Sequence, residues 1–131
     1  MRSEARQRGS VMIEAAIAFP VILVLLVGVV EYAWCFLRAH QVSSAAREGA
    51  RAGIRADGTS TQVVAAVDGA MTAYGLGSSG YSVSSTSVVV AAGETVQVDV
   101  SVTYEGNLEL LGLLPMPATL NASVVMAKEG P

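Results

Sequence analysis

The chain has 131 residues, a formal net charge of -3 and an apolar share of 52%. Its length fits one small folded domain together with a membrane anchor. The slightly acidic balance provides no basic surface, so we expect no nucleic-acid partner. Cys35 is the single cysteine, which excludes an internal disulfide. His40 is the single histidine, and the two residues together give no metal-ligand spacing.

A long apolar stretch covers residues 11–37, with Glu14 near its start and Glu31 near its end. As one helix it would be about 40 Å long, enough to cross a hydrocarbon core of roughly 30 Å with tilt. The apolar core of a cleaved secretory signal is shorter, about 7–15 residues, and a small-x-small cleavage site follows it closely. We therefore expect a retained transmembrane helix over residues 10–37, in which Pro20 is tolerated or makes a kink.

Arginines lie on both sides of this stretch, so the charge count alone does not orient it. Arg2, Arg6 and Arg8 precede it, which favours a cytoplasmic N-terminus. Four more arginines follow it: Arg38, Arg47, Arg51 and Arg55. A short tip inside and a folded polar part outside fit the sequence better. We expect a single-pass protein of the cytoplasmic (inner) membrane with an extracytoplasmic C-terminal head.

The two glutamates need a physical explanation, because a charge near the bilayer centre costs roughly 2.5–3.5 kcal/mol on insertion scales. Glu31 lies near the outer end, where an interfacial carboxylate is the simplest interpretation. Glu14 lies near the inner end. It either extends toward Arg8 and the interface, or pairs with a positive group from another subunit.

The N-terminal pattern is a glycine, Gly9, then Ser10, and a glutamate at position 14 just inside an apolar helix. This resembles the type IV prepilin signal. The resemblance implies that a prepilin peptidase cuts between Gly9 and Ser10. Ser10 would then carry the new amino group, and Glu14 would pair with the amino terminus of a neighbouring subunit.

A second stretch, QVSSAAREGARAG at residues 41–53, resembles the A-A-R-E-x-A-R segment of TadE-like proteins. These are minor pilins or pseudopilins of tight-adherence (Tad, Flp) pilus systems. Residues 121–129 also resemble the family's ending, although Ala127 stands where an arginine is common. The resemblance implies a non-catalytic membrane-anchored subunit of a pilus assembly or secretion apparatus. Its partners would be other pilin subunits and assembly proteins, with no cofactor and no small-molecule substrate.

Residues 38–56 contain no proline and many helix formers, so we expect the helix to continue as a stem. Arg47, Arg51 and Arg55 recur every four residues and share one face. Small residues form another surface: Ala45, Ala46, Gly49, Ala50, Ala52 and Gly53. Such a surface allows close approach. It packs on the chain's own sheet, or it contacts a neighbouring subunit together with the arginine face.

Residues 57–131 are expected to form an α+β head, after a leader at residues 1–9. Helical spacing of apolar residues predicts a second helix over residues 61–74. Beyond Gly80 the period becomes that of strands, at residues 81–90, 95–104 and about 120–126. A three-stranded antiparallel sheet needs a helix across its apolar face. The long N-terminal helix is the natural cover, which gives a pilin-like plan.

An apolar loop at residues 108–116 has two interpretations. It folds over an end of the sheet, or it forms an exposed patch that marks a partner surface. The second interpretation supports an alternative function, in which an unprocessed single-pass protein binds a partner through its outer domain. We expect no enzyme in either case, because the sequence shows no phosphate loop, nucleophile elbow or paired carboxylates.

Overall fold

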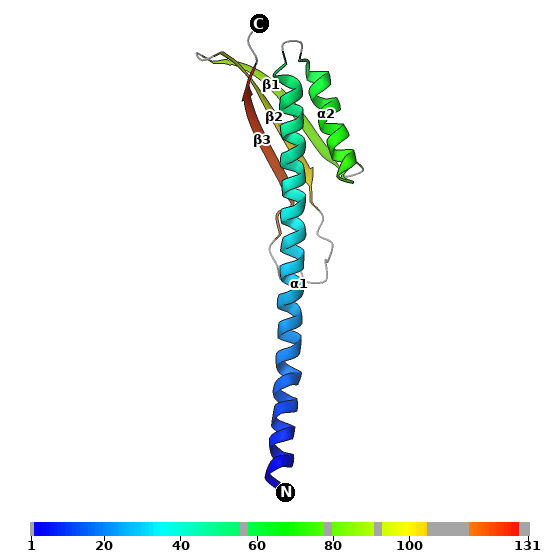
Figure 1. The fold of residues 1–131 in the computed structure, drawn as a ribbon, viewed down its shortest axis with the longest axis vertical. Helices are drawn as coiled ribbons and strands as arrows, with labels where there is room; N and C mark the ends of the chain where they lie inside the picture. Colours follow the sequence, from blue (N-terminus) through cyan, green and yellow to red (C-terminus); the bar gives the residue numbers. More distant parts are fainter. Residues whose placement is uncertain (1, 56–57, 78–79, 91–92, 105–115, 129–131) are drawn as a thin grey trace.

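A single helix, α1 (Arg2–Gly53), forms the axis of the molecule, and the rest of the chain packs around its C-terminal part (Figure 1). The computed structural model describes residues 2–55, 58–77, 80–90, 93–104 and 116–128, with the backbone alone for residues 2–10, 87–90 and 93. Pro20 lies inside α1 and does not end it. The expected stem is therefore continuous with the apolar segment, and it ends at Gly53, shortly before the expected bound of residue 56.

Helix α2 (Ser60–Ala73) has a capping motif at each end that the local sequence specifies. At its start, Thr59 Oγ1 accepts from the backbone N–H of Gln62 (3.3 Å), and Gln62 Oε1 accepts from that of Thr59 (3.0 Å). This capping box satisfies two N–H groups that the helix itself cannot. The helix confirms the prediction for residues 61–74 to within one residue at each end.

The C-terminal end of α2 is a Schellman motif, and it requires a glycine. Gly75 adopts a φ of +71°, a conformation that residues with a Cβ rarely adopt. The backbone N–H of Leu76 then donates to Met71 O (2.8 Å), and that of Gly75 to Thr72 O (3.0 Å). Met71 and Leu76 are both buried, so the turn also joins the core.

Three strands form one antiparallel sheet in the order β1-β2-β3. They are β1 (Tyr81–Val90), β2 (Gly93–Thr103) and β3 (Thr119–Ala127). Val100 in the central strand pairs with Val83 of β1 and with Ala122 of β3, which fixes the register. The predicted three-stranded antiparallel sheet is confirmed, and the strand bounds differ from the predicted ones by at most two residues.

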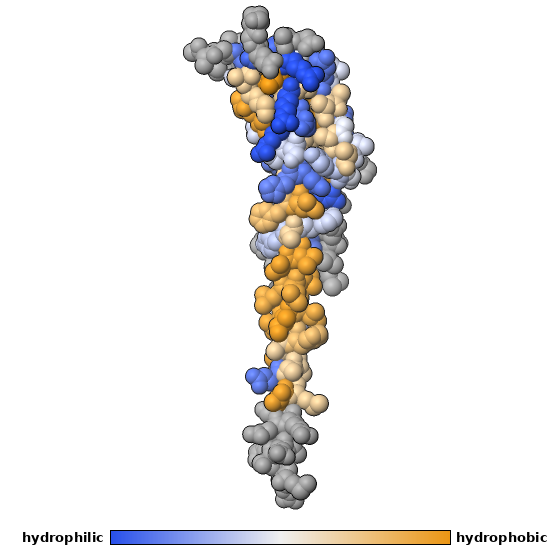
Figure 2. Space-filling view, viewed as in Figure 1, coloured by the Kyte–Doolittle hydropathy of each residue, from blue (hydrophilic) through white to orange (hydrophobic). Residues whose placement is uncertain are grey.

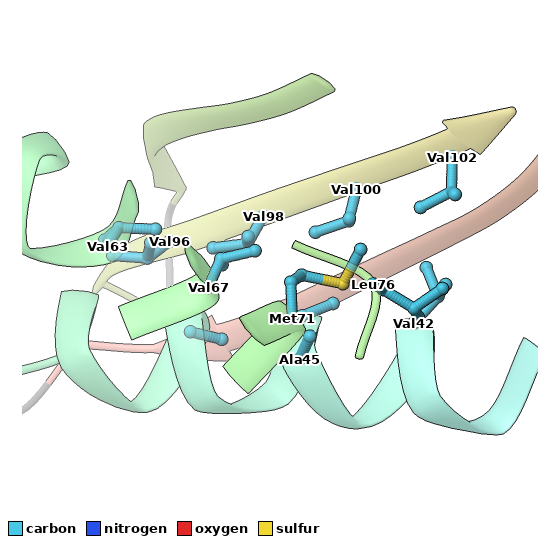
Figure 3. Packing of buried hydrophobic residues seen from close by; sticks show 12 residues of the cluster. Val42, Ala45, Val63, Val67, Met71, Leu76, Val96, Val98, Val100 and Val102 are labelled. Atoms are coloured by element: carbon cyan, nitrogen blue, oxygen red, sulfur yellow. The ribbon is translucent and has the colours of Figure 1, made fainter. Parts of the chain in front are cut away.

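The core lies between this sheet and the two helices (Figure 3). The valines of β2 at positions 96, 98, 100 and 102 are all buried, and the polar residues between them lie on the other face. The sheet thus has one face on the core and one face toward solvent, as strict alternation of apolar and polar residues predicts. α1 packs on the β2 and β3 side, and α2 packs beside it toward β1.

The close approach of α1 to the core depends on its glycines. A Cβ added at Gly49 would lie 2.5 Å from Val67 Cγ2, and one at Gly53 would lie 2.8 Å from Val96 Cγ1. Both distances are shorter than van der Waals contact, so these positions admit no side chain without a shift. The predicted α+β fold with a long N-terminal helix over a small sheet is confirmed.

Candidate functional site

The N-terminal half of α1 carries an apolar surface that the rest of the chain leaves uncovered. Side chains from residue 11 to residue 30 are exposed or half-exposed. Figure 2 shows this part as a hydrophobic band below the polar head, with one hydrophilic spot near its lower end. At 1.5 Å per residue the band is about 30 Å long, the thickness of a bilayer's hydrocarbon core. By length and composition it is a candidate membrane span, which indicates a single-pass membrane protein.

Glu14 is exposed near the start of this band. Gly9 and Ser10 precede it on the same helix, with a helical backbone. The structure thus places Gly9, Ser10 and Glu14 on one continuous helix leading into the apolar band. Cleavage after Gly9 and pairing of Glu14 with another subunit stay predictions.

Burial in α1 begins at Glu31, which is only 6% exposed, and continues at Cys35. We expected Glu31 to be an interfacial carboxylate, whereas its side chain is buried and has an interaction partner within the protein. Tyr104, which follows β2, lies nearby. Burial raises the pKa of its hydroxyl, and the proximity of Cys35 and Glu31 raises it further. Protein therefore covers one face of α1 from Glu31 onward, while Phe36 and Leu37 on the same stretch stay exposed.

The small residues of the stem face the chain's own head. Ala46 and Ala50 are fully buried in the core, and Gly49 lies against Val67. Of the two interpretations of this surface, packing on the chain's own sheet and α2 describes the monomer. These residues are already covered, so they are no free surface for a neighbouring subunit.

The arginine face of the stem points to solvent. Arg47 and Arg51 are exposed, and Arg51 Nη1 lies 3.0 Å from Glu48 Oε1. An exposed pair of this kind contributes little to stability. The face therefore remains available to a neighbouring subunit, and that contact is untested.

Arg38 is a residue whose role the sequence did not reveal. Its Nη1 donates to Gln41 Oε1 (3.2 Å) and to the backbone oxygen of Tyr74 (3.3 Å), while its Cζ lies 4.8 Å from the centre of the Trp34 ring. It therefore ties α1 to the C-terminal end of α2. The i, i+4 spacing of Trp34 and Arg38 was the available signal, since such residues are neighbours on a helix.

Among the described residues, no group of three or more histidine, cysteine, aspartate or glutamate side chains is placed to hold a metal ion. The apolar loop of residues 108–116 lies outside the described residues except for Met116, so neither interpretation of it is tested.

Comparison with known families adds to this geometry. The family model described as TadE-like protein matches residues 9–51, which confirms the TadE-like resemblance for that part of the chain. The resemblance of residues 121–129 to the family's ending lies outside the match and stays a prediction. The matched region contains Gly9, Glu14, the apolar band and nearly all of the stem, and it ends before α2 and the sheet. No curated protein and no solved structure matches the chain. The chain is thus similar to TadE-like proteins over the apolar band and most of the stem.

Proposed function

We propose that this chain is a non-catalytic minor pilin or pseudopilin of a tight-adherence pilus assembly or secretion system. The observation that carries the proposal is the TadE-like match over residues 9–51, because it falls on the helix whose apolar half is uncovered. A helix that is apolar on all sides must be buried in lipid or among similar helices. Lateral packing of α1 into a pilus base or pseudopilus satisfies that requirement.

The proposed mechanism begins with insertion of residues 10–37, with the N-terminus in the cytoplasm and the head outside the inner membrane. Prepilin peptidase then cuts between Gly9 and Ser10, which leaves a charged amino group on Ser10. Glu14 of a neighbouring subunit pairs with that group. Since an unpaired carboxylate in lipid costs roughly 2.5–3.5 kcal/mol, this pairing favours association of the helices over their separation.

The mass and N-terminal sequence of the protein from native membranes test the processing step. We expect a chain that begins at Ser10, with or without a methyl group. A chain that begins at Met1 in cells with active prepilin peptidase would contradict the pilin assignment. It would favour the alternative of an unprocessed anchored protein whose outer domain binds a partner.

Replacement of Glu14 tests the pairing step. Glu14→Ala should insert normally and lose incorporation into the assembled apparatus, as measured by cross-linking to neighbouring subunits and by piliation. Glu94→Ala is the control, because Glu94 is a glutamate of the sheet, away from the arginine face of α1, and its partner is Lys128 within the head. Normal piliation in the Glu14→Ala strain would refute the role of Glu14.

A further inference from the structure

Three residues form a cluster just beyond the apolar band, and we call it the membrane rim: Trp34, Arg38 and Tyr74. Trp34 lies four residues past Val30, so its Cα is about 6 Å above the end of the band. The headgroup layer on each side of a bilayer is about 5–8 Å thick. The one tryptophan of the chain therefore lies at headgroup level when the band fills the hydrocarbon core.

Arg38 brings its charge down to the same level. Its Cα is one turn farther from the band, but side chains on a helix point back toward the N-terminus. The 4.8 Å distance from its Cζ to the Trp34 ring centre shows that the guanidinium lies over the indole. A tryptophan ring with a cation above it is typical of the membrane interface, where one end is apolar and the other polar.

The third member comes from the other helix. The backbone oxygen of Tyr74 accepts a hydrogen bond from Arg38, so the C-terminal end of α2 reaches the level of Trp34. Figure 1 shows α2 running beside α1 with this end toward the apolar band. The last turn of α2 contains no basic residue of its own. Arg38 therefore supplies the positive charge that the carbonyl end of a helix favours.

We propose that the membrane rim binds the phosphate groups of lipids and thereby seats the C-terminal end of α2 on the membrane surface. The two hydrogen bonds of Arg38 to Gln41 and Tyr74, both described residues, use its Nη1. A guanidinium has five N–H donors in all, so it can also hold a phosphate. Trp34 is 38% exposed and Tyr74 is 36% exposed, which leaves both rings in reach of lipid.

A lipid surface is the occupant that the observations favour, because the rim is continuous with the apolar band. The same bilayer that covers residues 11–30 must extend past Trp34. The proposal thus requires that the band lies in a membrane, and it does not depend on processing or on a role in pili. An unprocessed anchored protein would seat its head in the same way.

Tryptophan fluorescence can locate the end of α2 in vesicles that contain the full chain. Tyr74→Trp adds a second indole on the rim while Trp34 stays in place, and subtraction of the wild-type signal isolates position 74. Val64→Trp is the matched control, because Val64 is 37% exposed on the same helix but about 15 Å farther from the rim. With phosphatidylcholine brominated near the headgroup, we expect strong quenching at position 74 and its loss at position 64.

Equal quenching at the two positions, or no quenching at position 74, would overturn the proposal. If the quenching at position 74 falls as the protein-to-lipid ratio rises, the proposal is also overturned, because a second copy of the chain would then cover the rim. The variants stay informative if one is unstable, since quenching of native Trp34 gives an independent depth for α1.

Amide exchange tests the phosphate contact itself. In the wild-type chain, we expect exchange at the last turn of α2 to be severalfold slower in phosphocholine micelles than in maltoside micelles, which lack phosphate. Arg38→Gln should abolish the difference, and Arg47→Gln, an exposed arginine of the head, should keep it. Equal exchange of the wild-type chain in both detergents would refute the proposal. Full protection by inorganic phosphate in maltoside would assign the contact to a free anion and overturn the lipid site.

Discussion

The two halves of α1 have similar apolar residues but different surroundings. Val24 is 49% exposed on the lower half, while Val42 is 1% exposed on the upper half. The lower half is apolar on all sides except at Glu14, whereas the upper half buries one face and presents Arg47, Glu48 and Arg51 on the other. One continuous helix thus has one half suited to lipid and one half packed in the head. The distribution of charge around the helix axis distinguishes the two halves.

Placing the same charge in each half should disrupt two different properties. Val42→Asp buries an unpaired carboxylate in the head, which costs several kcal/mol of a total stability of about 5–15 kcal/mol. We expect this variant to insert normally with a head that proteases digest rapidly. Val24→Asp should keep a folded head and lose insertion, by about 2.5–3.5 kcal/mol, as measured by membrane fractionation. A digested head in Val24→Asp, or failed insertion in Val42→Asp, would show that the halves are not independent.

Replacing a helical glycine with alanine should change the stability of the head by a smaller amount, with opposite signs at Gly49 and Gly69. Gly49→Ala should lower the free energy of unfolding of the head by about 1–3 kcal/mol, because its Cβ would overlap the stiff side chain of Val67. Gly69→Ala is the control in α2, where an added Cβ meets nothing within 4 Å. It should raise stability by about 0.5–1 kcal/mol. Urea denaturation followed by circular dichroism in micelles measures both, and stabilisation by Gly49→Ala would contradict the packing.

The smallest effect concerns an exposed hydrogen bond between α2 and β1 in the head. The Tyr81 hydroxyl donates to Asp68 Oδ1 at 2.8 Å, and this hydrogen bond raises the pKa of Tyr81, with burial and the Asp68 charge adding to it. The folded state therefore holds the phenol proton more tightly than the unfolded state. The resulting stability is complete below pH of about 10 and is lost as the pH rises through the folded pKa.

Asp68→Asn should lower the pKa of Tyr81 toward its ordinary value, as measured by tyrosinate absorbance during a pH titration. Asp99→Asn is the control, because the side chain of Asp99 accepts from Gln97 instead. An unchanged Tyr81 titration in Asp68→Asn would show that the hydrogen bond is absent in solution.

Most of the fold was predictable because its local signals agree with its packing. The alternation of Val96 to Val102 identified the buried face of β2, and the change of period at Gly80 located the start of β1. The glutamate after Gly9 and the A-A-R-E pattern identified the family that matches residues 9–51.

What the sequence did not predict is where protein replaces lipid around α1. Hydropathy predicted a span to residue 37, and it does not distinguish Cys35, which the head buries, from Trp34, which stays exposed. The burial of Glu31 and the reach of Arg38 to Tyr74 depend on contacts between residues far apart in the chain. No local sequence pattern predicts such contacts, and they become visible only in the folded structure, where the head packs against α1.

The continuity of α1 has a mechanical consequence. Its 52 residues form a rod of about 78 Å in which the apolar band and the head share one ladder of backbone hydrogen bonds, with no loop between them. An axial pull on the head is transmitted to the N-terminal end, and a rotation of the embedded half turns the head with it. The chain therefore transmits force and torque across the membrane surface as a shaft does, without a joint at which the two ends could swivel independently.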